Sequence, residues 1–277
     1  MVETIQFGYG KEPATRNLKL LNRHGIIAGA TGTGKTVTLK VITEQLSEAG
    51  IPVFLADIKG DLMSLAQAGT GEVDPERLAA THYDHYETAE YRVELWDALS
   101  KQGIPLRMTI SEIGPVLLAR ILGLNEIQTG ILNIVFAVSD AQGLLLIDLM
   151  DLRAMLNYVL ENASELSKHY GNIASSSVGA ILRSIVVLEQ QGAGAFFGEP
   201  ALELEDLMRV DSQGRGIINV LNAVALSQQP TLYATVLLAV LANLYESLPE
   251  VGDVDKPKLV FFFDEAHLMF NKTPEVL

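Results

Sequence analysis

A glycine-rich loop at residues 29–36 constrains this chain more than any other feature. It reads Gly-Ala-Thr-Gly-Thr-Gly-Lys-Thr and fits the phosphate-binding pattern G-x-x-x-x-G-K-[ST]. Gly32 and Gly34 allow the backbone to turn its N–H groups inward at the start of a helix, where they form a cradle for anions. The Lys35 ammonium can reach the β- and γ-phosphates, and the Thr36 hydroxyl can coordinate Mg²⁺. The loop therefore predicts a nucleoside triphosphate and a magnesium ion as ligands.

The sequence on either side of the loop predicts the local structure that such a loop needs. A short apolar run at residues 25–28 reads as a strand that enters the loop, and from Lys35 onward the apolar residues recur with helical spacing. Gly50 and then Pro52 are typical of the end of that helix. We expect a strand, a loop and a helix in succession. The residues predicted to bind the nucleotide are Thr31, Gly32, Thr33, Gly34, Lys35, Thr36 and Val37.

A pair of acidic residues follows the most apolar strand in the sequence. Residues 259–263 read Leu-Val-Phe-Phe-Phe and are followed by Asp264 and Glu265. Five consecutive apolar residues predict a strand buried on both faces, as in the centre of a parallel sheet. In P-loop ATPases this is the Walker B element, in which the Asp steadies Mg²⁺ and the Glu polarises the attacking water. We therefore assign Asp264 to the metal, with Thr36, and Glu265 to general base catalysis; a simple helix cap is the alternative.

Two secondary candidates follow another predicted strand, at residues 52–56. The segment after it reads Asp57-Ile58-Lys59-Gly60-Asp61. Ligands of open α/β sheets lie beyond the carboxyl ends of the strands, so Asp57 and Lys59 are candidates for the same site. An ordinary Asp/Gly turn is the alternative interpretation.

Other periodicities indicate an α/β core interrupted by helices. Residues 5–21 suggest a small hairpin, and residues 91–96 and 106–110 look like neighbouring strands. From Ser111 the apolar period changes from two to about 3.6 residues, which marks an inserted helical subdomain. We expect an ATPase core with a mainly parallel sheet, formed by segments 1–111 and 200–277, and an all-helical subdomain at residues 112–199.

Within these regions, shorter signals locate individual elements. Asn125 and Gln128 form a plausible helix cap, and Pro230 is suited to the first turn of a long apolar helix. Residues 216–221 predict a further buried strand. Three apolar stripes are expected to pack in the core rather than to bind a ligand: Ile127, Ile131, Ile134, Val135 and Val138; Leu152, Met155, Leu156 and Val159; and Val178, Ile181, Ile185 and Leu188.

Composition and charge narrow the choice of compartment and partners. The chain has 277 residues, of which 48% are hydrophobic, and it contains no cysteine. It shows neither a basic-then-apolar leader nor an uninterrupted apolar span, so a cytoplasmic protein with no membrane partner is expected. The formal net charge is −14. Because surfaces that hold nucleic acid are normally basic, this charge does not support DNA binding through a general field.

With these residues in view, the chain resembles the HerA–FtsK superfamily of ATPases, and most closely the bacterial HerA-like proteins of the YjgR type. The resemblance covers nearly the whole chain. It rests on the segments Asn22–Gly25, Gly29–Thr36, Asp57–Asp61, Gly114–Leu118 and Asp264–His267. It implies a RecA-like core interrupted by a helical subdomain, with ATP and Mg²⁺ as cofactors, and it implies hexameric rings that move DNA. Relatives continue well past the Walker B strand, so we expect this chain, which ends at Leu277, to lack a sensor residue and an arginine finger.

Three functional interpretations stay open on these grounds. The first is an ATPase motor module of a DNA translocase or helicase, since a water-activating Glu favours hydrolysis over phosphoryl transfer. The second is an ATP-dependent switch without translocase activity, which the acidic composition favours. The third is a DEAH-type RNA helicase, although the long interval between Thr36 and Asp264 argues against it. Residues 271–274 lack the final Asp of the guanine-specific pattern Asn-Lys-x-Asp, so ATP is expected rather than GTP.

Overall fold

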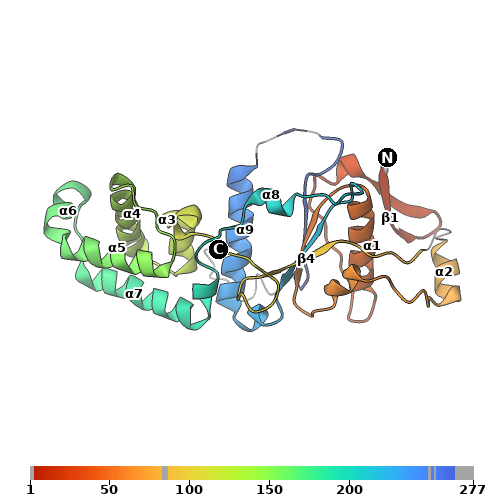
Figure 1. Ribbon diagram of the computed structural model, residues 1–277, viewed down its shortest axis with the longest axis horizontal. Helices are drawn as coiled ribbons and strands as arrows, with labels where there is room; N and C mark the ends of the chain where they lie inside the picture. The colour runs from red at the N-terminus through yellow and green to blue at the C-terminus, as the bar shows by residue number, and fades with distance from the viewer. Residues whose placement is uncertain (1–2, 83–86, 249–250, 253, 266–277) are drawn as a thin grey trace. The chain divides into compact units, whose positions relative to one another are not determined.

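The computed structural model describes residues 3–82, 87–248, 251–252 and 254–265. The chain divides into two compact units, each built from three segments. We call residues 1–96, 203–224 and 249–264 the sheet unit, and residues 97–202, 225–248 and 265–277 the helical unit. Figure 1 labels the nine α-helices of the described residues, β1 and β4.

The sheet at the centre of the fold has five strands in the order β5-β4-β6-β3-β7. Its strands are β3 (Val53–Asp57), β4 (Val93–Asp97), β5 (Ile104–Pro105), β6 (Ile218–Asn222) and β7 (Val260–Phe263). Strands β4, β6, β3 and β7 pair in parallel. All five residues of β3 are buried, as expected for a strand with neighbours on both sides. The observed α/β architecture with a helical stretch confirms the predicted fold class and is consistent with a RecA-like core.

Helix α1 (Lys35–Glu48) packs on this sheet through an apolar face. Leu39 and Leu46 are buried in one core cluster with Val53, Leu55 and Val220 of the strands. The helix ends as its sequence predicts, since Ala49 is the C-cap and Gly50 adopts a left-handed φ of 71°. A Cβ on Gly50 would lie 2.8 Å from the Gly214 carbonyl oxygen.

The C-terminal end of α1 is fixed to the amino ends of the strands. The Ser47 hydroxyl donates to the Gly216 carbonyl at 2.6 Å, and the Gly216 N–H donates to the Ser47 carbonyl at 2.7 Å. The Tyr91 hydroxyl donates to Glu48 Oε1 at 2.7 Å, and burial together with this bond raises the pKa of Tyr91. These contacts hold the helix end close to where β3, β4 and β6 begin.

Shorter elements complete the sheet unit. The hairpin of β1 (Thr4–Tyr9) and β2 (Pro13–Asn17) confirms the predicted hairpin, and β1 packs on α1. The expected continuation of strand structure to Leu21 is wrong, because Asn17 caps a 3-10 helix, η1 (Leu18–Leu20). The others are η2 (Leu62–Ala66), α2 (Pro75–Thr81) and α8 (Leu204–Leu207).

The helical unit contains α3 (Ile110–Ile121), α4 (Glu126–Ala141), α5 (Leu149–Glu161), α6 (Ala163–Tyr170), α7 (Ser175–Gln190) and α9 (Pro230–Ser247), with η3 (Ala193–Ala195) and η4 (Leu226–Gln228). The capping box of Asn125 and Gln128 is present, and Pro230 is at the start of α9, as predicted.

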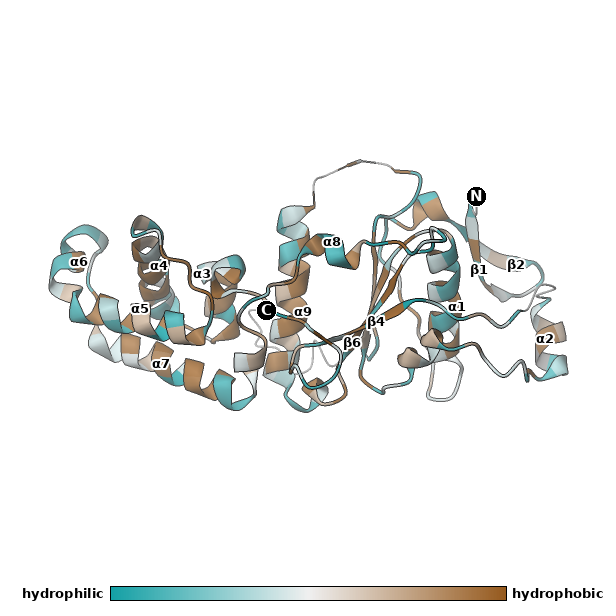
Figure 2. Ribbon diagram, viewed as in Figure 1, coloured by the Kyte–Doolittle hydropathy of each residue, from teal (hydrophilic) through white to brown (hydrophobic). Residues whose placement is uncertain are grey.

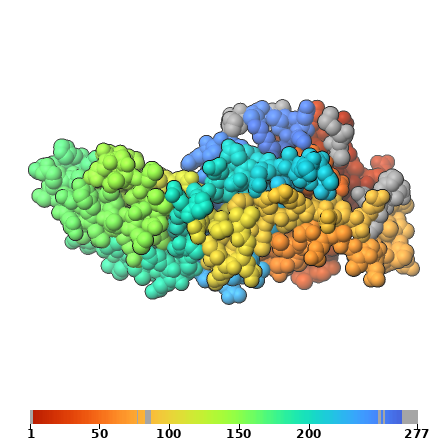
Figure 3. Space-filling model, in the orientation of Figure 1, coloured from red at the N-terminus to blue at the C-terminus, as the bar shows by residue number. Residues whose placement is uncertain are grey.

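Figure 2 shows α9 as mainly hydrophobic, in agreement with its many buried residues. In Figure 3 the side chains of the green helices form a continuous surface on the side shown.

The stripes predicted in the helical unit are mostly core. Every member of the second and third stripes is buried. In the first stripe Ile127, in the first turn of α4, is 69% exposed and Ile134 is half-buried, so these two residues are not core. Among the described residues, no single helix is long and apolar enough to cross a membrane. Only α6 and α7 taken together reach that length and composition, as a pair bent by 99°.

Two strand predictions near the site are wrong. Residues 25–28 form no strand, and the Ile26 side chain is 90% exposed, because no strand within the described ranges pairs with this run. Among the described strands, β7 is last in the sheet order and only partly buried, so the prediction of a strand buried on both faces is wrong. Residues 106–110 are also not a regular strand: Met108 makes an isolated bridge to Phe197, and α3 begins at Ile110.

Candidate functional site

The phosphate-binding loop has the backbone shape that its glycines predict. Gly32 and Gly34 have φ values of 82° and 92°, in the left-handed region that side chains other than glycine rarely adopt. Gly34 is the N-cap of α1 and makes no side-chain capping bond, so the first N–H groups of the helix are left for another acceptor. The Thr38 N–H then donates to the Gly34 carbonyl at 2.9 Å and begins the helix.

Lys35 closes the loop from within. Its ammonium donates to the carbonyl oxygens of Gly29 at 2.7 Å and Ala30 at 3.0 Å. The Thr33 hydroxyl also donates to the Ala30 carbonyl, at 2.8 Å. A Cβ on Gly29 would lie only 2.5 Å from Thr33 Oγ1, so a side chain at the first position of the loop would require the Thr33 hydroxyl to move from its bond to Ala30. The lysine is therefore held across the loop, with its charge at the loop's own centre.

The remaining loop residues predicted to bind nucleotide differ in exposure. Thr36 is half-buried at the first turn of α1, whereas Thr31 and Val37 are exposed, Val37 by 52%. Exposed backbone N–H groups and a half-buried hydroxyl at a helix N-terminus suit a charged ligand that remains partly in contact with water.

The start of α1 lies toward the carboxyl ends of the strands. Its C-terminal end is attached at the amino end of β6 through Ser47 and Gly216. Nearer its start, Lys40 Nζ donates at 2.9 Å to Ser64 Oγ, in the segment that follows the carboxyl end of β3. The 14 residues of α1 span about 21 Å, slightly more than a five-residue strand. The phosphate-binding loop therefore belongs to the edge of the sheet where the strands end.

Three polar residues form a row along that edge. Asn222 of β6 and Asp57 of β3 are register partners. The last register pair between β3 and β7 is Ala56 with Phe263, so the next position places Asp264 beside Asp57. Neighbouring strands are about 4.8 Å apart, which brings all three residues within reach of one ligand.

Both oxygens of the Asp57 carboxylate accept hydrogen bonds from the turn that follows β3. Asp57 is 1% exposed, and its two oxygens accept from the Gly60 N–H at 2.7 Å and the Leu62 N–H at 3.0 Å. These bonds fix the turn after β3. The geometry thus supports the turn alternative for the Asp57 side chain itself, while Lys59 in the same turn is exposed.

Glu265 directly follows Asp264 and is half-buried. Its φ is 50°, which is uncommon for a residue with a side chain and is found more often at functional sites. The Ala266 and His267 positions of the predicted Asp-Glu-Ala-His segment lie outside the described residues, as do residues 271–274.

Two polar residues at this edge were not among the predicted site residues. Asn222 is the polar end of the strand predicted at 216–221, and this position was the available signal. Asp61 was present in the segment that suggested Asp57, but nothing in the sequence separates it from an ordinary turn residue. Its Oδ1 atom is buried and has no hydrogen-bond partner in the described part of the chain.

The residues at this edge fit a magnesium ion that arrives with a nucleotide. No group of three or more His, Asp or Glu side chains able to hold a metal occurs in the described residues. Mg²⁺ does not require one, since in triphosphate sites it keeps several waters and takes one or two protein ligands besides the phosphates. The Thr36 hydroxyl and the carboxylates of Asp264 and Asp61 are of the right chemical type.

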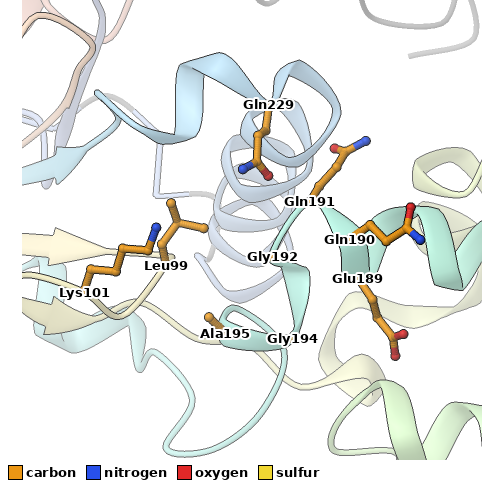
Figure 4. A pocket seen from close by; sticks show the side chains of 9 residues that line it. All are labelled: Leu99, Lys101, Glu189, Gln190, Gln191, Gly192, Gly194, Ala195 and Gln229. Atoms are coloured by element: carbon orange, nitrogen blue, oxygen red, sulfur yellow. The ribbon is translucent and has the colours of Figure 1, made fainter.

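A hollow of about 420 Å³ lies in the helical unit, away in sequence from the residues described above (Figure 4). Its lining includes Lys101, Gln191 and Gln229, and the Oε1 atoms of both glutamines are buried without a hydrogen-bond partner among the described residues. Its lining contains none of the loop or strand-end residues described above. We therefore assign it no part in phosphate binding.

Comparison with known proteins adds one result. The family model for the helicase HerA-like C-terminal domain matches residues 4–277. The search of curated proteins gives no match.

Proposed function

The chain belongs to the helicase HerA-like C-terminal family, and from this membership we propose that it binds ATP with Mg²⁺ and hydrolyses it. The observation that carries this proposal is the phosphate-binding loop. Two left-handed glycines and a lysine held across the loop stand at the uncapped start of a 14-residue helix. That combination is an anion site with a fixed cation, as triphosphate binding requires.

We assign the residues of the loop to binding and orientation. The N–H groups of residues 31–37 donate to phosphate oxygens, and Lys35 exchanges its bonds to Gly29 and Ala30, in whole or in part, for bonds to phosphate. Thr36 and Asp264 hold the metal. When bound, Mg²⁺ neutralises charge that develops on the phosphates.

Glu265 is the proposed general base. It follows the metal-binding Asp264 at the end of β7, where a carboxylate can accept a proton from the attacking water. Its left-handed backbone is a conformation that must be maintained by its surroundings. Lys35 is the second catalytic residue, because its charge stabilises the γ-phosphate as the bond to it breaks.

We also propose a role in DNA translocation and assembly into a hexamer. Both proposals depend on the proposed ATPase activity and rest on the resemblance to the HerA–FtsK superfamily. The net charge of −14 favours the alternative of an ATP-dependent switch that acts on a protein partner. Under either proposal, the nucleotide site is the same.

The test is a pair of substitutions in the nucleotide site. Lys35→Ala removes the fixed cation and should abolish binding of a fluorescent ATP analogue. Glu265→Gln keeps the shape of the side chain but removes the base, so it should leave binding within about twofold of wild type and lower the steady-state rate by ~100-fold or more. Lys11→Ala, an exposed change in the β1–β2 turn of the same unit, is the control and should alter neither quantity.

Two outcomes would contradict these assignments separately. Wild-type ATP affinity in the Lys35→Ala protein would remove the loop as the nucleotide site. An unchanged turnover rate in the Glu265→Gln protein would remove only the role given to Glu265.

A further inference from the structure

One buried carboxylate oxygen near the proposed nucleotide site accepts no hydrogen bond from the part of the chain that the structure describes. Asp61 Oδ1 is inaccessible to solvent and has no hydrogen-bond partner in the described residues. Burying a carboxylate without a partner costs free energy, so such groups are usually paired with a cation or a hydrogen-bond donor. The surroundings of Asp61 indicate which kind of ligand its Oδ1 atom can serve.

The segment that carries Asp61 is held in a defined shape. Both carboxylate oxygens of Asp57 are used to bind the N–H groups of Gly60 and Leu62, on either side of Asp61. Gly60 has a φ of 79°, which completes the turn. The Asp57 carboxylate therefore fixes the segment, and within the segment the Oδ1 atom of Asp61 is buried and accepts no hydrogen bond from the described residues.

A chain of hydrogen bonds connects this segment to the first turns of α1. Ser64 Oγ donates to the Asp61 carbonyl at 2.9 Å and accepts from Lys40 Nζ at 2.9 Å. Lys40 is four residues after Thr36, so the two side chains share one face of the helix. Helical side chains lean toward the N-terminus, which places the contact with Ser64 over the turn that carries Thr36.

We propose that Asp61 is a positioning residue for the magnesium ion of the bound nucleotide, accepting hydrogen bonds from water that the ion retains. This inference rests on the proposed function, because the ion arrives with ATP. Magnesium gives up its waters reluctantly, and carboxylates that bind those waters commonly fix the ion in place. The Thr36 hydroxyl supplies a direct ligand from the same side of α1.

The test compares how strongly magnesium improves nucleotide binding in variants of Asp61. The affinity for a fluorescent ATP analogue is measured in excess Mg²⁺ and in EDTA, and the ratio of the two is the readout. Asp61→Asn should lower this ratio by ~10-fold or more, as expected for loss of an outer ligand, with little change in EDTA. Asp61→Glu, which restores the charge, should recover part of the ratio.

Asp74→Asn is the matched control. Asp74 is an exposed carboxylate in the same unit, and it caps α2 by accepting from the Glu76 N–H at 3.0 Å. The same chemical change there should leave the magnesium ratio at the wild-type value. A purely structural role for Asp61 would instead shift the affinities in Mg²⁺ and in EDTA together.

A measurement on the wild-type chain covers the case in which Asp61→Asn fails to fold. Fe²⁺ in place of Mg²⁺, with ATP, ascorbate and peroxide, cleaves backbone close to the metal. We expect ATP-dependent cleavage near residues 57–64 as well as near the phosphate-binding loop. Cleavage at the loop alone would overturn the proposal.

The outcomes for this inference and for the proposed function are distinct. A wild-type magnesium ratio in a folded Asp61→Asn protein shows that Asp61 does not serve the ion, while ATP binding by the chain stands. A wild-type chain that binds no nucleotide in either buffer removes both proposals together.

Discussion

At the scale of single residues, the phosphate-binding loop is organised before any ligand is bound. The Lys35 ammonium is already fixed by two carbonyl oxygens, and Gly29, Gly32 and Gly34 each occupy a position where a side chain would collide or force an unfavourable backbone. A loop prepared in this way loses less conformational entropy when phosphate binds.

Gly32→Ala isolates the contribution of backbone shape. No atom lies within 4 Å of an added Cβ, so the only penalty is the left-handed φ of 82°. We expect the loop to be destabilised by about 1–2 kcal/mol and ATP affinity to fall by roughly tenfold, measured by fluorescence titration.

Gly130→Ala is the control, since Gly130 lies inside α4 with equal space around it. That change should raise stability by about 1 kcal/mol and leave affinity unaltered. Equal effects of the two substitutions on affinity would contradict this account.

Residues of the proposed site were assigned from sequence where the signal is local, and these assignments stay predictions. The loop lysine and glycines belong to one contiguous pattern, and Asp57 and Asp264 each end an apolar strand. Asn222 also follows a predicted strand, but its place beside Asp57 became apparent only from the register of β6 with β3. Asp61 was identified only by its buried Oδ1 atom, which has no hydrogen-bond partner among the described residues. Both depend on which strands and turns become neighbours, which the sequence does not state.

At the scale of elements, α1 connects the proposed nucleotide site to the sheet. Its buried face includes Leu39 and Leu46, but its partly buried side also carries Glu44, one turn before Glu48. Desolvation, and then repulsion from Glu48, raise the pKa of Glu44. This carboxylate therefore opposes folding whenever it is ionised.

Glu44→Gln should stabilise the protein in a pH-dependent way. Because the pKa of Glu44 is higher in the folded than in the unfolded state, ionisation favours unfolding at pH values above the unfolded pKa of about 4.3. The variant should have the higher melting temperature at pH 7, and the difference should disappear as the pH falls below about 4. Glu112→Gln, which keeps the capping amide oxygen but removes the negative charge from the first turn of α3, should instead slightly destabilise the protein at pH 7. A gain from Glu44→Gln that persisted unchanged at acid pH would indicate a cause other than ionisation.

Element boundaries followed the sequence where caps and turns define them. The capping box of α4, the proline that begins α9 and the glycine after α1 were all predicted and are present. The errors concern strands whose position depends on distant partners. Residues 25–28 have the composition of a strand but no partner in the described chain, and the apolar β7 is last in the sheet instead of central.

At the scale of the whole molecule, the two units share one interleaved chain. Each is built from three separate segments, so neither can be produced by a single cut. The predicted subdomain limits of 112–199 stay a prediction. The net charge of −14 is summed over all 277 residues and bears on the partners of the chain.

Duplex DNA should bind this chain only weakly. Without a basic surface field, few phosphate contacts form, so the logarithm of affinity should fall with the logarithm of salt concentration at a slope of roughly −2 or shallower. Fluorescence anisotropy with labelled duplex between about 50 and about 200 mM salt measures the slope. Labelled poly-glutamate, a polyanion that has no phosphates, is the control and should not bind. A slope of about −6 or steeper would show an extensive phosphate-binding surface and would favour the translocase over the switch.

The attachment of α1 at Ser47 and Gly216 limits how the site can move. A Cβ at Gly216 would lie 2.2 Å from the Ile51 carbonyl, so this end of the helix has no slack. If the phosphate-binding loop moves, we therefore expect α1 to rotate about its fixed C-terminal end. The displacement would be largest at Thr36 and close to zero where the strands begin.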